Sequence, residues 1–452
     1  MAINRLERLE NKPILNSIFI LSFPVILGNL ATVIYNLTDA YFVGQLQDVA
    51  QLAGATFSYP LLMILMSIGE IFGIGGASYL SRCLGAGRKD LAEKTIAKSF
   101  VSVFVAGVFI GLFCIVFLDP IIKLLGSSGD AYNYTRSYVF ILLCATPIIM
   151  MNTISIDMLR AEGAAKFASI GMAIGVLTNL ILDPLFIFVF GLEIKGAAIA
   201  TVIGNFVAFC FSIFVFKYKT LIKIKIKKGF EKSGIFFEII KVGIPSALNI
   251  ILMSVAMIIT NNIAALYGES VVAGMGLALR NHSIVIQVLL GFSMGAMPLI
   301  GYFYGKKDYK KVRKIIYSNM GIITTIGTVL SVIFFIFAEP MISIFNSDPD
   351  VIYNGARGLR ALLLCKPIIG IFMVSMSSVQ AMGKGFTALV FSVTRQLFLF
   401  IIATFLLNYY FGYNGFIYGQ SISDFIMIIF AGIVITVILR RLNKPENKLE
   451  IV

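Results

Sequence analysis

Charged residues are scarce in this sequence. Lys, Arg, Asp and Glu make up only 13% of its 452 residues, whereas hydrophobic residues make up 58%. A soluble domain typically has roughly 25% charged and about 45–50% apolar residues. A soluble fold of this composition could not cover its surface with polar groups. The composition therefore excludes cytosolic enzymes and disordered proteins.

Several chemical signatures are also missing. The five cysteines are scattered and none lies in a paired metal spacing, which indicates packing residues in a protein without disulfides. The chain has no GxxxxGK[ST], no HExxH and no pair of Asp-rich motifs to hold phosphate through magnesium. We therefore expect neither ATP hydrolysis nor a bound cofactor. No small-residue cleavage site follows the first apolar run, so we expect no processing of the N-terminus.

Long apolar runs recur along the whole chain. A helix needs about 20 residues to cross the bilayer core, and in lipid each backbone polar group needs an internal partner. The runs therefore predict an all-α integral membrane protein with twelve transmembrane helices. Their approximate ranges are 18–41, 49–80, 96–118, 134–158, 167–190, 196–216, 235–266, 271–303, 315–338, 355–378, 387–407 and 414–439.

Positive charge alternates between the loops. The formal net charge is +14, and Lys and Arg are concentrated after the second and eighth runs and in the linker 217–234. The loops after the first and seventh runs have none. By the positive-inside rule both termini and the linker are cytoplasmic. A nucleic-acid surface is the weaker interpretation, because no aromatic interleaving or binding motif accompanies the charge.

The chain also repeats itself. Gly87-Arg88-Lys89-Asp90 recurs as Gly305-Lys306-Lys307-Asp308, and Pro147-Ile148-Ile149 recurs as Pro367-Ile368-Ile369. Each half holds six predicted helices, so the halves insert in the same orientation. We expect two parallel six-helix lobes, 1–216 and 235–452, joined by the linker 217–234 and related by a pseudo-twofold along the membrane normal. Transporters use this layout, with a site between the halves.

Ionisable residues inside a membrane span are costly and indicate function. Asp39 and Asp183 are both predicted in the outer half of the first lobe. Asn179 lies four residues before Asp183, and Thr201 and Asn205 are also four residues apart, so each pair shares a helix face. Their oxygens suit either a small hard cation such as Na+ or a shared proton. The alternative is a polar cluster that only ties helices together.

The second lobe lacks these acids. By the repeat, Asp39 matches Thr260 and Asp183 matches Ala403, which favours a function confined to the first lobe.

Other ionisable residues lie in the second lobe. Arg395 and Asp424 predict a buried ion pair, with a substrate or gating role as the alternative. His282 is the only histidine; a structural role is the first interpretation and a proton relay the second. The 18 Met and 39 Phe residues could line an adaptable site for bulky apolar ligands. We expect most of these side chains to face lipid or to pack inside the protein.

Three motifs carry a family resemblance. Residues 35–44 (YNLTDAYFVG) and 295–305 (GAMPLIGYFYG) resemble the first-helix and eighth-helix motifs of the multidrug and toxic compound extrusion (MATE) family. Residues 179–184 (NLILDP) resemble the fifth-helix motif of its DinF/MepA-like branch. The resemblance covers essentially the whole chain. It implies a cation-coupled (H+ or Na+) antiporter in the cytoplasmic membrane of a bacterium, exporting lipophilic, often cationic small molecules and acting as a monomer.

The resemblance also assigns roles to residues. The coupling-cation site of the family carries over onto Asp39, Asn179, Asp183 and Thr201. Pro24 matches a proline proposed as a bending point of the first helix. The supporting polar residues that we expect around the site are Tyr35, Asn36, Tyr138, Asn152 and Asn205.

Other classes fit the sequence less well. A lipid-linked saccharide flippase of the same superfamily would want basic residues in its cleft, where Arg280 and Arg395 are the only candidates. A major-facilitator transporter usually has an acid before the basic loop that follows its second helix, and residues 84–89 (LGAGRK) lack it. A membrane-embedded enzyme would need a metal or nucleophile beside the outer acids, and the sequence offers neither.

Overall fold

The computed structural model describes residues 5–46, 49–125, 127, 129, 131–231 and 234–442. Helices are the only regular secondary structure within these ranges. The first half contains α2, α3, α4, α6, α7, α8 and α9, with short helices α1, α5 and α10. The bounds are α1 Arg5–Glu10, α2 Ile14–Gly44, α3 Val49–Gly85, α4 Lys89–Val116, α5 Leu118–Leu124, α6 Ala131–Cys144, α7 Thr146–Ala161, α8 Ala165–Pro184, the π-helical turn η1 Leu185–Val189, α9 Glu193–Tyr218 and α10 Ile226–Gly229.

The second half follows the same order after residue 234. Its helices are α11 Ile235–Ala265, α12 Glu269–Gly305, α13 Tyr309–Ile336, α14 Ala338–Ser343, α15 Pro349–Leu363, α16 Gly370–Ala381, α17 Gly385–Val393, the π-helical turn η2 Thr394–Leu399, α18 Phe400–Phe416 and α19 Gly419–Leu442.

The number of continuous spans differs from the expected twelve. Among the described residues, ten helices are long and apolar enough to cross a membrane, and the pair α6 and α7, bent by 58°, gives an eleventh. The tenth predicted span, 355–378, is divided between α15 and the 12-residue α16, which is too short to cross alone. Pro147 lies in the first turn of α7, and its repeat partner Pro367 lies between α15 and α16. Proline has no backbone N–H and disfavours helix at the preceding residue, so both lobes are interrupted at the same place.

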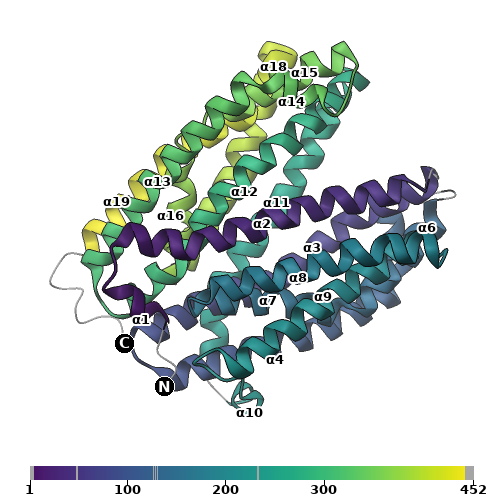
Figure 1. Cartoon of the computed structure of the whole chain (residues 1–452). Helices are drawn as coiled ribbons and strands as arrows, with labels where there is room; N and C mark the ends of the chain where they lie inside the picture. The colour runs from purple at the N-terminus through teal and green to yellow at the C-terminus, as the bar shows by residue number, and fades with distance from the viewer. Residues whose placement is uncertain are drawn as a thin grey trace.

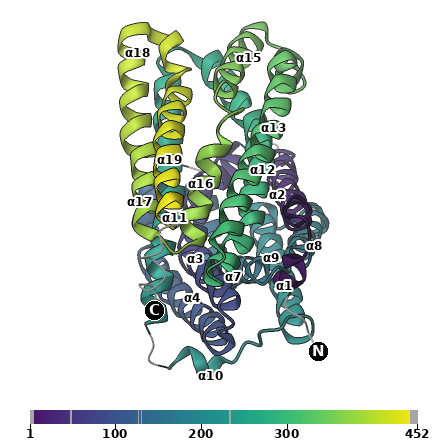
Figure 2. The ribbon, with the colours of Figure 1, turned by 90° about the vertical axis from the view of Figure 1, so that its left-hand side faces the viewer.

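Figure 1 shows the two groups of helices diverging from the end at which α1 and the last turns of α19 lie. The quarter-turned view in Figure 2 separates the same groups, with α15, α18 and α19 far from α4 and α10. Contacts between the groups run through α3, which packs against α11 and α12, and through α2, which packs against both α8 and α12. The arrangement is the two-lobed membrane protein expected from the repeat.

Glycines allow the closest contact between the groups. A Cβ built on Gly243 of α11 would lie 1.9 Å from the carbonyl oxygen of Ile71 on α3. One on Gly75 of α3 would lie 2.1 Å from the carbonyl oxygen of Ile239 on α11. Both distances are far below a van der Waals contact, so only glycine fits at these two positions. Close approach through small residues is the usual way in which membrane helices pack.

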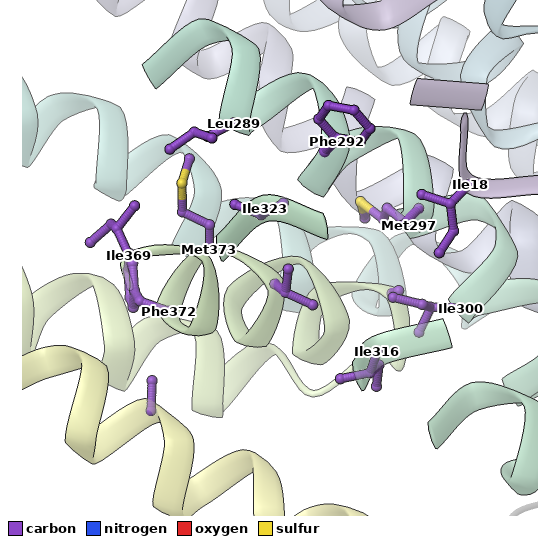
Figure 3. Packing of buried hydrophobic residues seen from close by; sticks show 14 of the residues in the cluster. Ile18, Leu289, Phe292, Met297, Ile300, Ile316, Ile323, Ile369, Phe372 and Met373 are labelled. Atoms are coloured by element: carbon purple, nitrogen blue, oxygen red, sulfur yellow. The ribbon is translucent and has the colours of Figure 1, made fainter. Parts of the chain in front are cut away.

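The largest buried apolar cluster lies in the second lobe. Figure 3 shows Leu289 and Phe292 of α12 together with Phe372 and Met373 of α16 and Ile18 of α2. The first half of α2 therefore shares the core of the second lobe, although the sequence places it in the first. Many large apolar side chains remain exposed elsewhere, including Phe109, Phe237 and Tyr409, as expected of a surface that faces lipid.

Candidate functional site

The first lobe brings four of the predicted site residues together. The Asn179 side-chain nitrogen, on α8, donates to Asp183 Oδ1 at 3.1 Å and to Thr201 Oγ1, on α9, at 3.4 Å. The hydroxyl of Tyr35, on α2, lies 3.1 Å from Thr201 Oγ1. Asp183 is completely buried. The structure thus joins α2, α8 and α9 through one connected set of polar side chains.

Two further predicted residues complete the set. Asp39, on α2, is close enough to Asp183 to interact electrostatically. Tyr138, on α6, is buried and close enough to Thr201 and Asp39 to interact with them. The side chain of Asn36 lies outside the described part of the structure. The cluster therefore receives side chains from four helices of one lobe.

The arrangement leaves buried oxygens without donors. Asp39 Oδ1, Asn179 Oδ1 and Asp183 Oδ2 are all buried and have no hydrogen-bond partner. An unsatisfied buried oxygen costs about 1–3 kcal/mol, and more when it is charged. Two carboxylates, an amide oxygen and a hydroxyl are suitable ligands for H+ or for Na+. In the described residues no group of three or more His, Cys, Asp or Glu side chains could hold a metal ion.

The end of α8 explains why Asp183 is presented at this point. Pro184 follows it directly and the chain continues as the π-helical turn η1. Proline removes one backbone donor, and π-helical turns are frequent at functional sites. The wider turn therefore begins two residues after Asp183.

Asn152 and Asn205 connect the site to α7. Asn152 Nδ2 donates to Asn205 Oδ1 at 3.0 Å, and Asn205 Nδ2 donates to the carbonyl oxygen of Thr201 at 2.9 Å. Pro24 lies away from this network, and its carbonyl accepts a hydrogen bond from Ser169 of α8. The helix α2 continues through Pro24.

The second lobe holds a buried charged triad. Asp424 accepts from Lys366 Nζ at 2.5 Å and from Arg395 Nη2 at 2.9 Å, and Gln420 Nε2 donates to it at 2.9 Å. The predicted pair of Arg395 and Asp424 is present, but the sequence analysis missed Lys366, which is completely buried. His282 is near enough to interact with the triad electrostatically, and Arg280 is exposed.

A second cluster in the first lobe was also missed. Glu70 on α3 lies beside Asp157 on α7, and Arg160 Nη1 lies 3.6 Å from Asp157 Oδ1. A search for ionisable residues inside predicted spans could have found Glu70, Asp157 and Lys366, since all three fall within the ranges expected to cross the membrane.

Comparisons with known proteins agree with this architecture. The MatE family model matches residues 24–185 and 245–406, one copy in each lobe. The multidrug export protein MepA of Staphylococcus aureus (strain MSSA476) is 30% identical over 447 residues, covering 97% of each chain. MepA of Staphylococcus haemolyticus (strain JCSC1435) is 29% identical over 445 residues, again covering 97% of each.

Solved structures give the same result. A crystal structure of MATE in complex with MaL6 has a TM-score of 0.93 at 25% identity, covering 97% of this chain and 99% of that one. An outward-facing multidrug resistance MATE transporter of the MOP superfamily also has a TM-score of 0.93 at 25% identity, with coverage of 98% and 100%. With the family model matching most of the sequence, this multi-pass membrane protein belongs to the MATE family and to its MepA-like branch.

Proposed function

We propose that this chain is a cation-coupled multidrug antiporter. It exports lipophilic, often cationic compounds by alternating access, driven by H+ or Na+. It works as a monomer in the cytoplasmic membrane of a bacterium, with both termini in the cytoplasm. The observation that carries the proposal is the group of three buried oxygens without donors, on Asp39, Asn179 and Asp183.

These oxygens need a positive partner. Two carboxylates at one depth of the first lobe repel each other and are poorly solvated, so binding one H+ or Na+ removes an unfavourable charge. The donors that would coordinate the ion come from α2, α8 and α9. Ion binding therefore draws these helices together, and its release frees them.

Coupling requires that the ion bind the two transport states differently. The lobes diverge away from the end where α1 lies (Figure 1), so the cluster near Asp183, at the far end of α8, belongs to the end at which they are apart. An ion that enters there draws α2, α8 and α9 together and lowers the affinity of the protein for a cationic substrate. The substrate leaves outward, and the ion is released after the lobes rearrange. The relatives named as multidrug export proteins support an exporter with many substrates.

Dye efflux from proteoliposomes tests the proposal. Ethidium export is followed while pH and sodium gradients are imposed separately, for the unchanged protein, Asp183→Asn, Asp39→Asn and the control Asp119→Asn. Asp119 lies in the short helix α5 with its side chain exposed and paired with Arg136, so its variant keeps efflux. The two site variants reach the membrane but lose gradient-driven efflux at least about tenfold, as expected when an interaction worth about 1.4 kcal/mol or more is removed. Full efflux in both would refute the site.

The geometry gives no support to a saccharide flippase. Of its two candidate basic residues, Arg280 is exposed and Arg395 is paired with Asp424, which also pairs with the buried Lys366. A multidrug exporter is therefore the function that the described residues favour.

A further inference from the structure

The cluster of Glu70, Asp157 and Arg160 has no part in the proposed outer site. Glu70 comes from the middle of α3, and Asp157 and Arg160 come from the last two turns of α7. The chain enters α8 at Ala165, directly after this end of α7, and Asp183 lies near the far end of α8. A helix of 20 residues is about 30 Å long. The two acidic clusters of the first lobe therefore lie at different depths, with Asp157 and Arg160 nearer the end at which α8 begins.

The cluster contains buried polar atoms without partners, among them Arg160 Nε as well as two carboxylate oxygens. The side chains of Asp157 and Arg160 are only 6% and 10% exposed, and the Glu70 and Asp157 carboxyl groups are within hydrogen-bonding reach of each other. Glu70 Oε2 and Asp157 Oδ2 are buried and receive no hydrogen bond from another group. Two adjacent carboxylates cannot both remain ionised without a large penalty, and a single shared proton removes it.

Arg160 neutralises only one of the two acids. It lies 3.6 Å from Asp157 Oδ1, and its Nη2 also contacts the sulfur of Met172 on α8. With both acids ionised the cluster carries a net charge of −1, and with one proton bound it is neutral. Among the described residues, Glu70, Asp157 and Arg160 are the only charged groups that interact within the cluster.

The space beside Asp157 is too small for an organic cation. A Cβ built on Gly73 of α3 would lie 2.3 Å from Asp157 Oδ2, so the carboxylate is pressed against the helix backbone. Arg160 also occupies the adjacent side of the carboxylate and repels a second cation. A proton fits between the two acids, whereas a substrate ammonium group does not.

A cavity gives this carboxyl pair a route for exchange. It is lined by Asp157, Arg160 and Ala161 of α7 and by Met294 and Met297 of α12, so it lies between the two lobes. A cavity at this place changes shape when the lobes separate.

We propose that Glu70 and Asp157 form a second proton-binding site at the inner end of the first lobe. One proton is shared between the two carboxyl groups, and it passes to or from water in the cavity between the lobes when α12 moves away from α7. The inference rests on the proposed function, because it gives the transport cycle a proton-binding site on the side opposite to Asp39 and Asp183.

Infrared spectroscopy tests the site on the full-length protein in lipid. Difference spectra between mildly acidic and mildly alkaline buffer are recorded for the unchanged protein, Glu70→Gln, Asp157→Asn and the double variant Asp39→Asn/Asp183→Asn. We expect a protonated-carboxyl band that disappears in Glu70→Gln and in Asp157→Asn but persists in the double variant. Glutamine and asparagine keep the shape of each side chain, and either variant removes the shared proton, so one folded variant is enough. An unchanged band in both would overturn the proposal.

Transport measurements separate this site from the outer one. In Glu70→Gln we expect proton-driven ethidium efflux to fall at least about tenfold while ethidium binding to the purified protein stays within about twofold of the unchanged value. Weaker ethidium binding instead would mean that the pair recognises the substrate cation, which would overturn the proton site. If the double variant transports normally, the outer coupling site fails, while the infrared result for Glu70 and Asp157 stands.

Discussion

Asn152 on α7 and Asn205 on α9 are joined by a side-chain hydrogen bond of 3.0 Å. The side-chain nitrogen of Asn205 donates a hydrogen bond to the backbone carbonyl oxygen of Thr201. The hydroxyl of Thr201 accepts a hydrogen bond from the side chain of Asn179. The position of Thr201 in the outer cluster therefore depends on a pair of amides that does not touch the carboxylates.

The first prediction concerns this amide pair. Asn152→Ala leaves Asn205 Oδ1 without its donor, so we expect a loss of about 1–3 kcal/mol in the free energy of unfolding and slower ethidium efflux. Thermal unfolding in detergent and dye efflux measure the two effects. The control is Thr153→Ala, because the Thr153 hydroxyl donates only to the carbonyl of Ile149 within its own helix. Equal behaviour of the two variants would contradict a positioning role for Asn152.

The second prediction concerns the charged triad of the second lobe. Asp424→Asn leaves Lys366 and Arg395 without a counter-charge in a buried site. Removing one partner of a buried ion pair costs about 3–5 kcal/mol, so we expect a clear fall in melting temperature in detergent. Lys366→Met is the matched comparison, since Asp424 keeps Arg395 and Gln420 as donors, and it should destabilise the protein less. A larger effect of Lys366→Met would show that Asp424 is not the centre of the triad.

The third prediction is a pH dependence of stability. Glu162 lies in the turn between α7 and α8, and burial raises its pKa to about 8, against the opposing influence of Arg5 and Lys223. In the unfolded chain a glutamate titrates near pH 4.3. Between these two values the folded protein holds a proton that the unfolded chain has released, so stability falls as pH rises from about 4.3 to about 8.

The variant Glu162→Gln tests whether Glu162 makes stability fall as pH rises. Because glutamine does not titrate, the variant should lose this part of the pH dependence, and its stability relative to the unchanged protein should rise with pH, by on the order of a few kcal/mol. Melting temperatures across this pH interval measure the difference. A difference that stays constant with pH would contradict the raised pKa.

The sequence predicted the parts of the molecule that depend on local patterns. Long apolar runs and the repeat predicted the all-helical, two-lobed membrane fold, and the spacing of Asn179 and Asp183 correctly predicted one shared helix face. The breaks near Pro147 and Pro367 were missed, because a short interruption barely changes the hydropathy of a run. Asn152 and Asn205 were both predicted near the site, but the hydrogen bond between them could not be predicted, since tertiary packing alone brings α7 beside α9.

The buried charges were harder to interpret from sequence. Lys366 falls in the middle of the tenth predicted span, 355–378, and the apolar run did not show that it lies beside Pro367 in a break between α15 and α16. Glu70 and Asp157 are distant in the sequence and become a pair only where α3 packs on α7. A single acid in an apolar run does not reveal its partner, and the chemistry of these residues depends on that partner.

The last prediction uses the glycine contact between the lobes. Gly243→Ala places a methyl group against the carbonyl oxygen of Ile71, where the available distance is 1.9 Å. The backbones of α3 and α11 must then move apart at the end where α1 lies. If alternating access opens the lobes at this end, the substitution shifts the population toward the state in which they are separated.

Labelling measures that shift. Ala77, which lines the cavity between the lobes, is replaced by Cys in a background without the five native cysteines, and a maleimide that cannot cross membranes is applied from the side of the termini. We expect faster labelling with Gly243→Ala than without it. The control is Gly276→Ala on α12, where an added Cβ meets nothing within 4 Å, so labelling should stay unchanged. Slower labelling with Gly243→Ala would mean that the added methyl group distorts the contact between α3 and α11 without opening it. It would also mean that α3 and α11 do not separate during transport.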